Sequence, residues 1–495
     1  MPNYMDQNLL DYIQKLSSIF FKMSTICNNQ SSFILSQNNI WKNIEKTGRK
    51  SVRFQYVTPS ASLSYQSSTK TANKSCSSFS STGKFGKFGG KYVPELLVTC
   101  LSDLEEEFYM ALNDAKFQEE LGTALRDYVG RETALYYAER LSEHYKDKDG
   151  YGPEIYIKRE DLNHGGAHKI NNALAQAMLA KRMGRMSIVT ATGAGQHGVA
   201  AAAVCAKLGL SCTVIMGRLD IERQPTNVRL MKLLGALVKP VDGNYKDASS
   251  EAVREWVGNL DTSYHMPGSV IGPHPCPTMV REFQSVIGKE VRKQAMEKWG
   301  GKPDVLVACV GSGSNAMGLF HEFIEDEEVR LVGVEAAGFG LETGYHSATL
   351  SRGEVGVYHG SMSYLLQDDE GQIVGPYSIG VGLECPGVGP ELSYLKDNGR
   401  AEFHAVTDEE ALHAYKRLCR LEGIFPALEA SHALAALEKL CPNLPHGTKV
   451  VVNCSGRGDK DAATVQKLDQ LRLSTAMVRE NNTSNSSKQL QTAIH

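Results

Sequence analysis

The stretch Val305-Leu306-Val307-Ala308-Cys309-Val310-Gly311-Ser312-Gly313-Ser314-Asn315 predicts the fold class of this chain. Its apolar run lacks polar alternation, which is typical of a parallel strand buried on both faces, and it ends in a glycine turn that opens a helical pattern. Similar apolar runs lie at 155–157, 187–189, 212–216, 332–334 and 450–452. This alternation predicts an α/β fold of open, mostly parallel sheets flanked by helices, with ligands beyond the carboxyl ends of the strands.

The composition argues against several classes of protein. The 495 residues contain 53 Lys and Arg against 56 Asp and Glu, a net charge of -3, so a nucleic-acid-binding or polybasic membrane surface is not expected. No run of about 18 apolar residues occurs, so we expect no membrane-spanning helix. The 11 cysteines are scattered and none are spaced as C-x-x-C, which excludes a zinc ribbon or thioredoxin-type pair and fits a reducing compartment.

The two ends differ in composition from the centre of the chain. Residues 1–82 are rich in serine, and Asp6, Asp11 and Glu45 are their only acidic residues. This composition is typical of an organelle transit peptide, although a merely disordered leader would also show it. Residues 473–495 are polar and rich in Asn and Ser, which predicts a disordered, solvated tail.

Lys169 is the first candidate for chemistry. It follows the turn Gly165-Gly166 and opens a predicted helix near 171–182. A helix N-terminus disfavours positive charge, so an amine placed there can be neutral and can form a Schiff base with an aldehyde. The position alone is weak evidence, because most lysines at such sites are solvated surface groups.

The glycine loop at 311–315 is a candidate phosphate site. Free backbone N–H groups at a helix start, together with serine and asparagine side chains, form a cradle for an anion. The alternative is a tight turn between a strand and a helix. The loop is not a P-loop, since no Gly-Lys-Ser/Thr follows, and it lacks the G-x-G-x-x-G spacing of dinucleotide-binding proteins.

Two more loops follow predicted strands. Thr192-Gly193-Ala194-Gly195-Gln196-His197 predicts a second anion cradle, suited to a substrate carboxylate. Ser455, after the strand 449–452, has a hydroxyl that can donate a hydrogen bond to a ring nitrogen. A Schiff-base lysine, a phosphate cradle, a carboxylate cradle and a hydroxyl for a heterocycle match the requirements of pyridoxal 5'-phosphate.

On these motifs the chain resembles the β chain of tryptophan synthase, a family of fold type II pyridoxal-phosphate enzymes. The resemblance covers about residues 84–470. Its further motifs are Phe88-Gly89-Gly90-Lys91-Tyr92-Val93-Pro94, Lys158-Arg159-Glu160-Asp161-Leu162, Gly272-Pro273-His274-Pro275 and Pro426-Ala427-Leu428-Glu429.

The resemblance implies a domain organisation and a location. Two open, mostly parallel sheets flanked by helices hold the cofactor between them. The segment 83–290 contains the Schiff-base lysine and a mobile closing subdomain, and the segment 291–472 contains the phosphate loop. Together with the serine-rich leader, the resemblance indicates the plant form, which a transit peptide directs to the chloroplast stroma.

The resemblance also implies roles for individual residues. Lys169 joins the cofactor and moves the substrate α-proton, Ser455 meets the pyridine nitrogen, and Glu429 lies near the phenolic oxygen. Arg223 and Asp220 belong to the closing subdomain, whose closed state pairs Arg223 with Glu384. The phosphate is held by His168, Gly311, Ser312, Gly313, Ser314 and Asn315, and the substrate carboxylate by Thr192, Gly193, Ala194, Gly195, Gln196 and His197.

The implied reaction is that of a lyase of tryptophan biosynthesis. L-serine loses its β-hydroxyl, indole attacks the β-carbon, and L-tryptophan and water are the products. The implied assembly is a homodimer with tryptophan synthase α chains at its ends, which Lys246 would contact. Backbone carbonyls near Gly311, Cys385 and Gly387 resemble a site for a monovalent cation, Na⁺ or K⁺.

The chain departs from the family on the acceptor side of the site. A glutamate that acts as the family's acid–base group is Ala191 here, and loss of such a group typically costs about 10²–10⁴-fold in rate. Pro267 and Cys385 also change the acceptor pocket. Glu384 replaces a shorter aspartate, and we take it as a candidate catalytic residue that reaches toward the vacated carboxylate position.

Three functions therefore remain open from the sequence. The first is a tryptophan synthase β-type enzyme. The second is a specialised β-replacement or β-elimination enzyme that uses another nucleophile or an activated serine. The third is a catalytically weak regulatory paralogue that binds an α or β chain. The intact Lys169, Ser455 and phosphate loop argue against the third.

Overall fold

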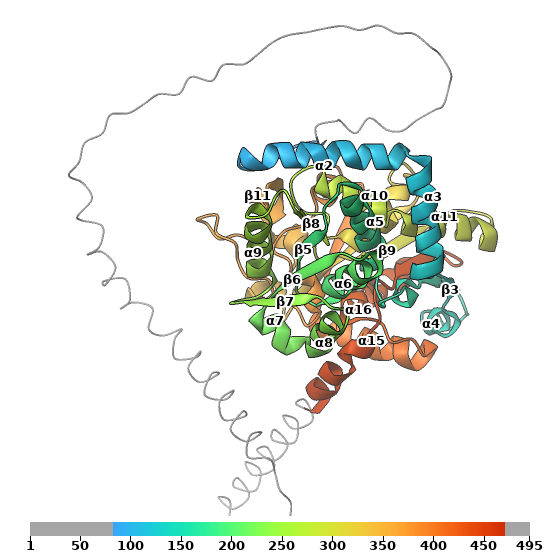
Figure 1. Cartoon of the computed structure of the whole chain (residues 1–495). Coiled ribbons are helices and arrows are strands. Elements are labelled where there is room, and N and C mark those ends of the chain that lie inside the picture. The colour runs from blue at the N-terminus through green and yellow to red at the C-terminus, as the bar shows by residue number, and fades with distance from the viewer. Residues whose placement is uncertain (1–82, 471–495) are drawn as a thin grey trace, which may run out of the picture. The chain divides into compact units, whose positions relative to one another are not determined.

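The computed structural model describes residues 83–470 (Figure 1), so the predicted leader and tail lie outside the described residues. The apolar run that opens at Val305 forms the strand β9 of a six-stranded sheet. All neighbouring strands of this sheet are parallel except the antiparallel edge pair β4–β3. Its order is β13 (Ala401–Thr407), β10 (Arg330–Gly338), β9 (Val305–Cys309), β14 (Lys449–Asn453), β4 (Glu154–Lys158) and β3 (Leu135–Tyr137).

A second sheet has four strands that are all parallel. Its order is β7 (Leu237–Val241), β6 (Ser211–Gly217), β5 (Ser187–Thr192) and β8 (Ser263–His265). The two sheets, one mostly and one entirely parallel, and their flanking helices confirm the predicted α/β class. The predicted division at residues 290 and 291 falls inside one helix, and the two segments stay a prediction.

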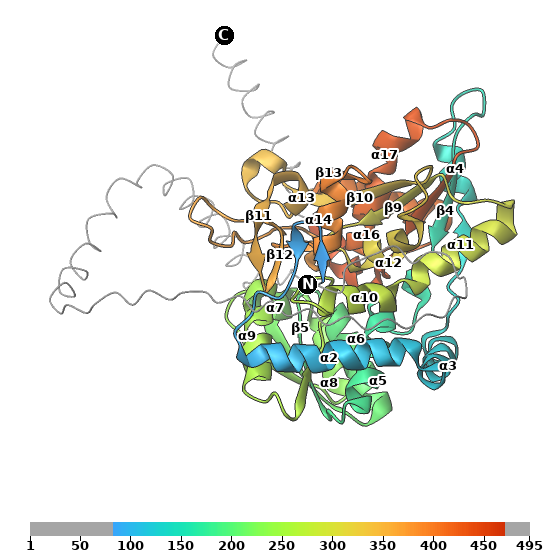
Figure 2. The same ribbon diagram turned by 90° about the horizontal axis from the view of Figure 1, so that it is seen from above.

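A third, antiparallel sheet was not predicted from the sequence. Its order is β1 (Lys84–Phe85), β2 (Phe88–Gly89), β12 (Ser361–Leu365) and β11 (Glu354–Tyr358). Figure 2 shows the start of the described chain lying beside β11 and β12, although more than 250 residues separate them in sequence. Tyr358 pairs with Ser361, so a two-residue turn joins β11 to β12.

Helices cover the faces of the parallel sheets (Figures 1 and 2). None of the helices within residues 83–470 is both long and apolar enough to cross a lipid bilayer. The main helices are α2 (Leu96–Asn113), α3 (Ala115–Ala124), α4 (Glu139–His144), α5 (Lys169–Arg182), α6 (Gln196–Leu208), α7 (Arg218–Arg223), α8 (Pro225–Leu233), α9 (Tyr245–Val257), α10 (Cys276–Gln284), α11 (Val286–Trp299), α12 (Ser314–Phe320), α13 (Thr349–Arg352), α14 (Pro390–Asp397), α15 (Asp408–Glu422), α16 (Leu428–Ala435) and α17 (Leu437–Leu440).

The strands are apolar on both sides because helices pack on both sheet faces. In β5, Ile188 belongs to the core under α6, whereas Val189 and Ala191 pack with Ala248 and Ala252 of α9. The residues of β9 divide in the same way between a core with α16 and a core with α11 and α12. Successive side chains of a strand point to opposite faces, so an uninterrupted apolar run satisfies both layers.

Candidate active site

Most of the predicted site residues line one cavity beyond the carboxyl ends of β5, β9 and β14. Its volume is about 820 Å³, which includes the solvent at its mouth. Gly195, Asp220, Arg223, Pro267 and Gly387 do not line it. The predicted residues that do are His168, Lys169, Ala191, Thr192, Gly193, Ala194, Gln196, His197, Gly311, Ser312, Gly313, Ser314, Asn315, Glu384, Cys385, Glu429 and Ser455.

Lys169 is the first residue of α5, and its half-buried side chain lines the cavity. Its Nζ donates to the carbonyl oxygen of Gly268 at 2.5 Å and to Ser314 Oγ at 2.8 Å. Burial lowers the pKa of Lys169 to about 8, because removal from water disfavours the ammonium form. A substantial part of the amine is therefore neutral near physiological pH, as Schiff-base formation requires.

The rate of cofactor uptake by the apoprotein should reflect this pKa. The neutral amine is the nucleophile, so uptake should rise with pH until Lys169 is deprotonated. We expect a roughly tenfold increase from pH 6 to 7 and a plateau above about pH 9, since the pKa is about 8. The measurement is stopped-flow absorbance after pyridoxal phosphate is added to apoprotein. A rate that keeps climbing to pH 10 would show an ordinary lysine pKa.

The loop after β9 has the shape that a phosphate cradle needs. Gly313 has φ 99°, and a Cβ atom added there would come within 2.0 Å of Leu392 Cδ1. Only glycine therefore fits this turn, which brings backbone N–H groups to the start of α12. Asn315 Nδ2 donates to the Cys309 carbonyl at 2.8 Å and ties the loop back to β9.

His168 connects this loop to the loop after β14. Its Nδ1 lies 3.0 Å from the Ser455 carbonyl oxygen, and its Nε2 lies 3.0 Å from Ser314 Oγ. A carbonyl can only accept, so Nδ1 carries the proton and Nε2 accepts from Ser314. Burial lowers the pKa of His168 to about 3, so the imidazole is neutral. A hydrogen-bond chain thus runs from Lys169 through Ser314 to His168.

Ser455 and Glu429 line the remaining wall. The Ser455 hydroxyl is buried, with Cys309 Sγ at 3.6 Å, so a neutral donor is available to a ring nitrogen. Glu429 accepts from the Gly382 N–H at 2.9 Å and from Lys460 Nζ at 3.3 Å. Burial raises the pKa of Glu429, but the Lys460 ammonium outweighs this, so the pKa lies below its ordinary value.

The loop after β5 forms the second cradle. Gly195 has φ 85° and precedes α6, and the first N–H groups of a helix can bind an anion. A Cβ at Gly195 would meet Asn227 Cβ at 2.5 Å, and Asn227 Nδ2 holds the Ala194 carbonyl at 2.6 Å. His197 Nε2 lies 3.1 Å from the Met266 carbonyl oxygen, and burial lowers its pKa to about 3. These contacts hold the loop in the conformation of the predicted cradle.

Arg223 and Glu384 form an ion pair beside the cavity. The two guanidinium nitrogens of Arg223 donate to the two oxygens of Glu384 at 2.8 and 3.0 Å, and the Ser378 N–H donates to the same carboxylate at 3.0 Å. Asp220 lies 3.8 Å from Arg223, and none of the described residues hydrogen-bonds its buried carboxylate. Both Glu384 oxygens are thus occupied in this arrangement, and its role in proton transfer stays a prediction.

A second cavity of about 990 Å³, including solvent at its mouth, adjoins the first. Pro267 lines this second cavity, so the three predicted acceptor residues come together around it. Tyr245, at the start of α9, was not identified from the sequence, because nothing in its local pattern shows that it contacts the β5 loop. The residues shared by both cavities are Ala191, Tyr245, Gly268, Ser269 and Cys385.

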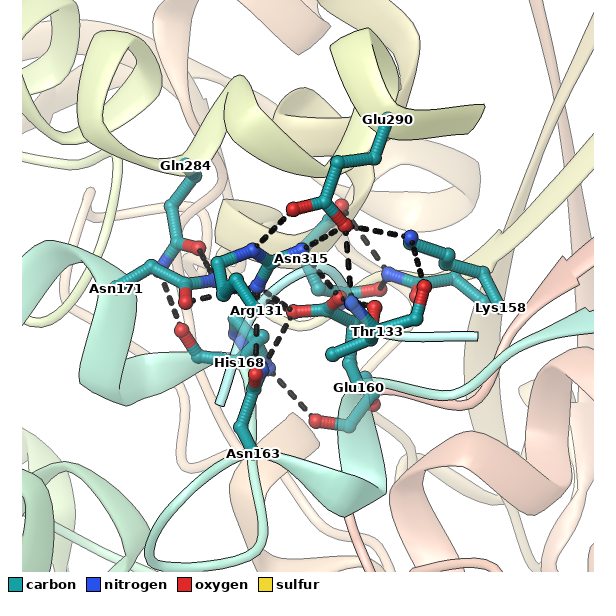
Figure 3. A network of polar contacts seen from close by, with 12 residues as sticks. Arg131, Thr133, Lys158, Glu160, Asn163, His168, Asn171, Gln284, Glu290 and Asn315 are labelled. Atoms are coloured by element: carbon teal, nitrogen blue, oxygen red, sulfur yellow. Dashed lines mark hydrogen bonds and ion pairs between the residues drawn. The ribbon is translucent and has the colours of Figure 1, made fainter. Parts of the chain in front are cut away.

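Sequence reasoning also missed a buried network of charged residues (Figure 3). Arg131 donates to both oxygens of Glu290, at 2.7 and 2.8 Å, and to both oxygens of Glu160, at 2.8 and 2.9 Å. Lys158 Nζ donates to the same Glu290 carboxylate at 2.6 Å. Lys158 at the end of the apolar strand β4 could have indicated the network from the sequence, because a buried charge requires a partner of opposite charge.

This network continues to the backbone that positions Lys169. Arg131 Nη1 donates to Asn171 Oδ1 at 2.9 Å, and Asn171 Nδ2 donates to Gln284 Oε1 at 3.2 Å. Gln284 Nε2 in turn donates to the His168 carbonyl at 3.2 Å (Figure 3). Buried hydrogen bonds from Arg131 and Gln284 therefore hold the first turn of α5, which begins at Lys169.

A metal ion bound by side chains needs several ligands that lie close together. Among residues 83–470, no group of three or more His, Cys, Asp and Glu side chains is placed to hold one. The Cys385 carbonyl, one of the predicted cation ligands, lies 3.3 Å from Thr349 Oγ1 and 3.5 Å from Ser347 Oγ. The monovalent cation stays a prediction.

The sequence matches the family described as "Pyridoxal-phosphate dependent enzyme" over residues 127–456, which is more than half of the chain. The protein therefore belongs to the family of pyridoxal-phosphate dependent enzymes. Among solved structures, it is similar to the crystal structure of a fungal L-serine ammonia-lyase from Rhizomucor miehei. That match has a TM-score of 0.52 and 16% identity, and it covers 69% of this chain and 98% of the fungal chain. At this identity the match shows a shared fold.

Proposed function

We propose that this protein is a tryptophan synthase β-type enzyme, which replaces the β-hydroxyl of L-serine with indole to give L-tryptophan and water. The observation that supports this best is the second cavity, which shares Ala191 and Cys385 with the Lys169 cavity. Trp256, Met266 and Ile271 give it apolar walls. A β-elimination enzyme needs no site for a second organic substrate, whereas a β-replacement enzyme does.

Bound pyridoxal phosphate supplies an electron sink for bond changes at the α- and β-carbons of serine. The glycine loop after β9 would hold its phosphate, and the loop after β5 would hold the serine carboxylate. Neutral Lys169 Nζ accepts the proton from the serine α-carbon. The neutral Ser455 hydroxyl would hold the ring nitrogen of the cofactor without protonating it, and a ring held in this way would favour chemistry at the β-carbon over transamination. The Arg223–Glu384 pair holds α7 against the site and helps to exclude water.

The departing hydroxyl of serine needs a proton, and Ala191 stands where the family has the glutamate that would supply it. Ala191 lies at the end of β5 and borders both cavities. We expect Ala191→Glu to raise the rate of tryptophan formation from serine and indole by about 10²-fold, the lower range for a positioned acid–base group. Product formation is measured by liquid chromatography with mass spectrometry.

The matched control is Ala191→Gln, which has the same length but cannot donate or accept the proton. It should be no faster than the wild-type protein. If the glutamate and glutamine variants have equal rates, the missing carboxylate does not limit turnover. The group that protonates the hydroxyl would then lie elsewhere, with Glu384 the first candidate because it lines the same cavity.

A specialised β-replacement or β-elimination enzyme is the second candidate. The departures from the family pattern favour it, because Ala191, Pro267 and Cys385 all line the second cavity. The residues predicted to bind the cofactor are all present in the first cavity. The test is mass spectrometry of products from serine or O-acetylserine with a panel of nucleophiles. A product with another nucleophile, formed faster than tryptophan, would favour this candidate. A regulatory paralogue would give none.

For the assembly, we propose a homodimer that acts with tryptophan synthase α chains in the chloroplast stroma. The basis is the family resemblance and the composition of the leader. The net charge of -3 supports neither a nucleic-acid nor a membrane partner. Sedimentation with and without an α chain tests the assembly.

A further inference from the structure

A pair of polar side chains lies in the second cavity on the side away from Lys169. Ser249 on α9 and His359 in the turn between β11 and β12 line the second cavity and do not line the first. Ser249 Oγ lies 2.7 Å from His359 Nε2, which is a hydrogen bond between residues 110 positions apart. Neither residue has a part in the proposed chemistry.

The backbone at His359 has a conformation that is uncommon for residues other than glycine. Its φ is 46°, and it is the one non-glycine residue with positive φ among residues 83–470. His359 and Gly360, whose φ is 80°, form the two-residue turn between paired Tyr358 and Ser361. Such turns prefer Asn, Asp or Gly at the first position, and another residue there costs about 1 kcal/mol. Histidine is therefore present at a turn position whose backbone conformation favours Asn, Asp or Gly.

The pair is uncharged and incompletely hydrogen-bonded. Burial lowers the pKa of His359 to about 4, so its imidazole is neutral, with one donor and one acceptor nitrogen. No described residue hydrogen-bonds its Nδ1. The neighbouring Tyr358 hydroxyl is buried and has no hydrogen-bond partner among the described residues. A ligand in the second cavity can supply the missing partners, because Ser249, Tyr358 and His359 all line it.

The rest of the second cavity suits a flat, neutral molecule. Trp256 is stacked on His265 with ring centroids 5.5 Å apart, and Tyr245 borders the junction with the Lys169 cavity. Burial lowers the pKa of His265 to about 4, so this imidazole is neutral as well. No lysine, arginine, aspartate or glutamate lines the described part of the cavity, which disfavours a charged ligand.

We infer that the Ser249–His359 pair binds a hydroxyl group on a planar aromatic nucleophile, so that the acceptor site binds a hydroxylated aromatic ring more tightly than unsubstituted indole. This rests on the proposed function, because the ring occupies the acceptor site of a β-replacement. The reacting carbon faces the junction at Ala191 and Cys385, and the hydroxyl faces the pair at the other side. A site built to hydrogen-bond a substituent discriminates against the analogue that lacks it.

The test is calorimetric titration of the full-length, cofactor-loaded protein without serine, using 5-hydroxyindole and indole as probes. We expect 5-hydroxyindole to bind about tenfold more tightly, which corresponds to one or two neutral hydrogen bonds. Ser249→Ala and His359→Phe should each bring the ratio of the two dissociation constants close to one. Ser250→Ala is the matched control, because Ser250 bonds the Lys246 carbonyl one residue further along α9 and does not line the cavity.

His359→Gly separates recognition from a merely structural role. Glycine suits the positive φ, so this variant should fold with unchanged or higher thermal stability and still lose the preference. The inference is overturned if the wild-type protein binds both probes equally, or if the variants keep the wild-type ratio. Serine turnover is measured separately, so its absence would refute the proposed reaction while leaving the binding preference as an independent result.

Discussion

Lys169→Met is expected to abolish covalent cofactor attachment and to lower serine turnover by at least about 10³-fold, since it removes both a covalent anchor and a proton acceptor. Lys169 is the one lysine or arginine among the described residues that line the first cavity. Its amine is placed by hydrogen bonds to Gly268 and Ser314. Borohydride reduction followed by peptide mapping should locate the cofactor on the peptide that contains residue 169 in the wild-type protein only.

The matched control for this prediction is Lys181→Met. Lys181 lies on the same helix and is exposed to solvent, so its replacement should leave both attachment and turnover at the wild-type level. A cofactor label on any other lysine would contradict the assignment of the site. It would also remove the basis of the proposed reaction, because no other lysine among residues 83–470 lines the cavity that holds the two cradles.

Arg131→Met is expected to have the largest effect on stability. The guanidinium neutralises two buried carboxylates, Glu160 and Glu290, and its removal leaves them with Lys158 as the remaining cation of the network. Breaking a buried ion pair from one side typically costs about 3–5 kcal/mol, because the remaining charge stays desolvated. The free energy of unfolding is measured by urea denaturation of the cofactor-loaded protein.

Arg330→Met makes the same chemical change at an exposed ion pair. Arg330 and Glu402 are both 43% exposed, so its loss should cost less than about 1 kcal/mol. Equal effects of the two substitutions would mean that Lys158 alone suffices to hold both carboxylates. Arg131→Met should also weaken cofactor retention, since the network holds the His168 carbonyl through Asn171 and Gln284.

Much of the fold could be predicted because the relevant signals are local. The apolar run at β9 and the similar runs at β4, β5, β6, β10 and β14 were each identified from consecutive residues. The third sheet could not be predicted in this way. Its strands β1 and β2 have two residues each, and β2 is held by pairing with β12, which lies far along the chain. Such pairing depends on distant contacts rather than on local pattern.

The candidate site also has a part that local sequence motifs predict and a part that depends on distant contacts. The cradles and Lys169 are encoded by short motifs, since a glycine turn between a strand and a helix determines where its N–H groups point. Tyr245, Ser249 and His359 have no motif of their own. They become neighbours only when α9 packs on β5 and the hairpin of β11 and β12 folds against α9.

The sequence by itself determined the α/β class, the strand–loop–helix cradles and the lysine at the start of α5, because each depends on the conformation of a few adjacent residues. Only the tertiary structure decided that a second cavity adjoins the first, that Ser249 faces His359, and that Arg131 joins two buried carboxylates 130 residues apart. These contacts carry no local signature. They form when separate sheets and helices bury their apolar faces together, and the polar groups trapped between them must then find partners.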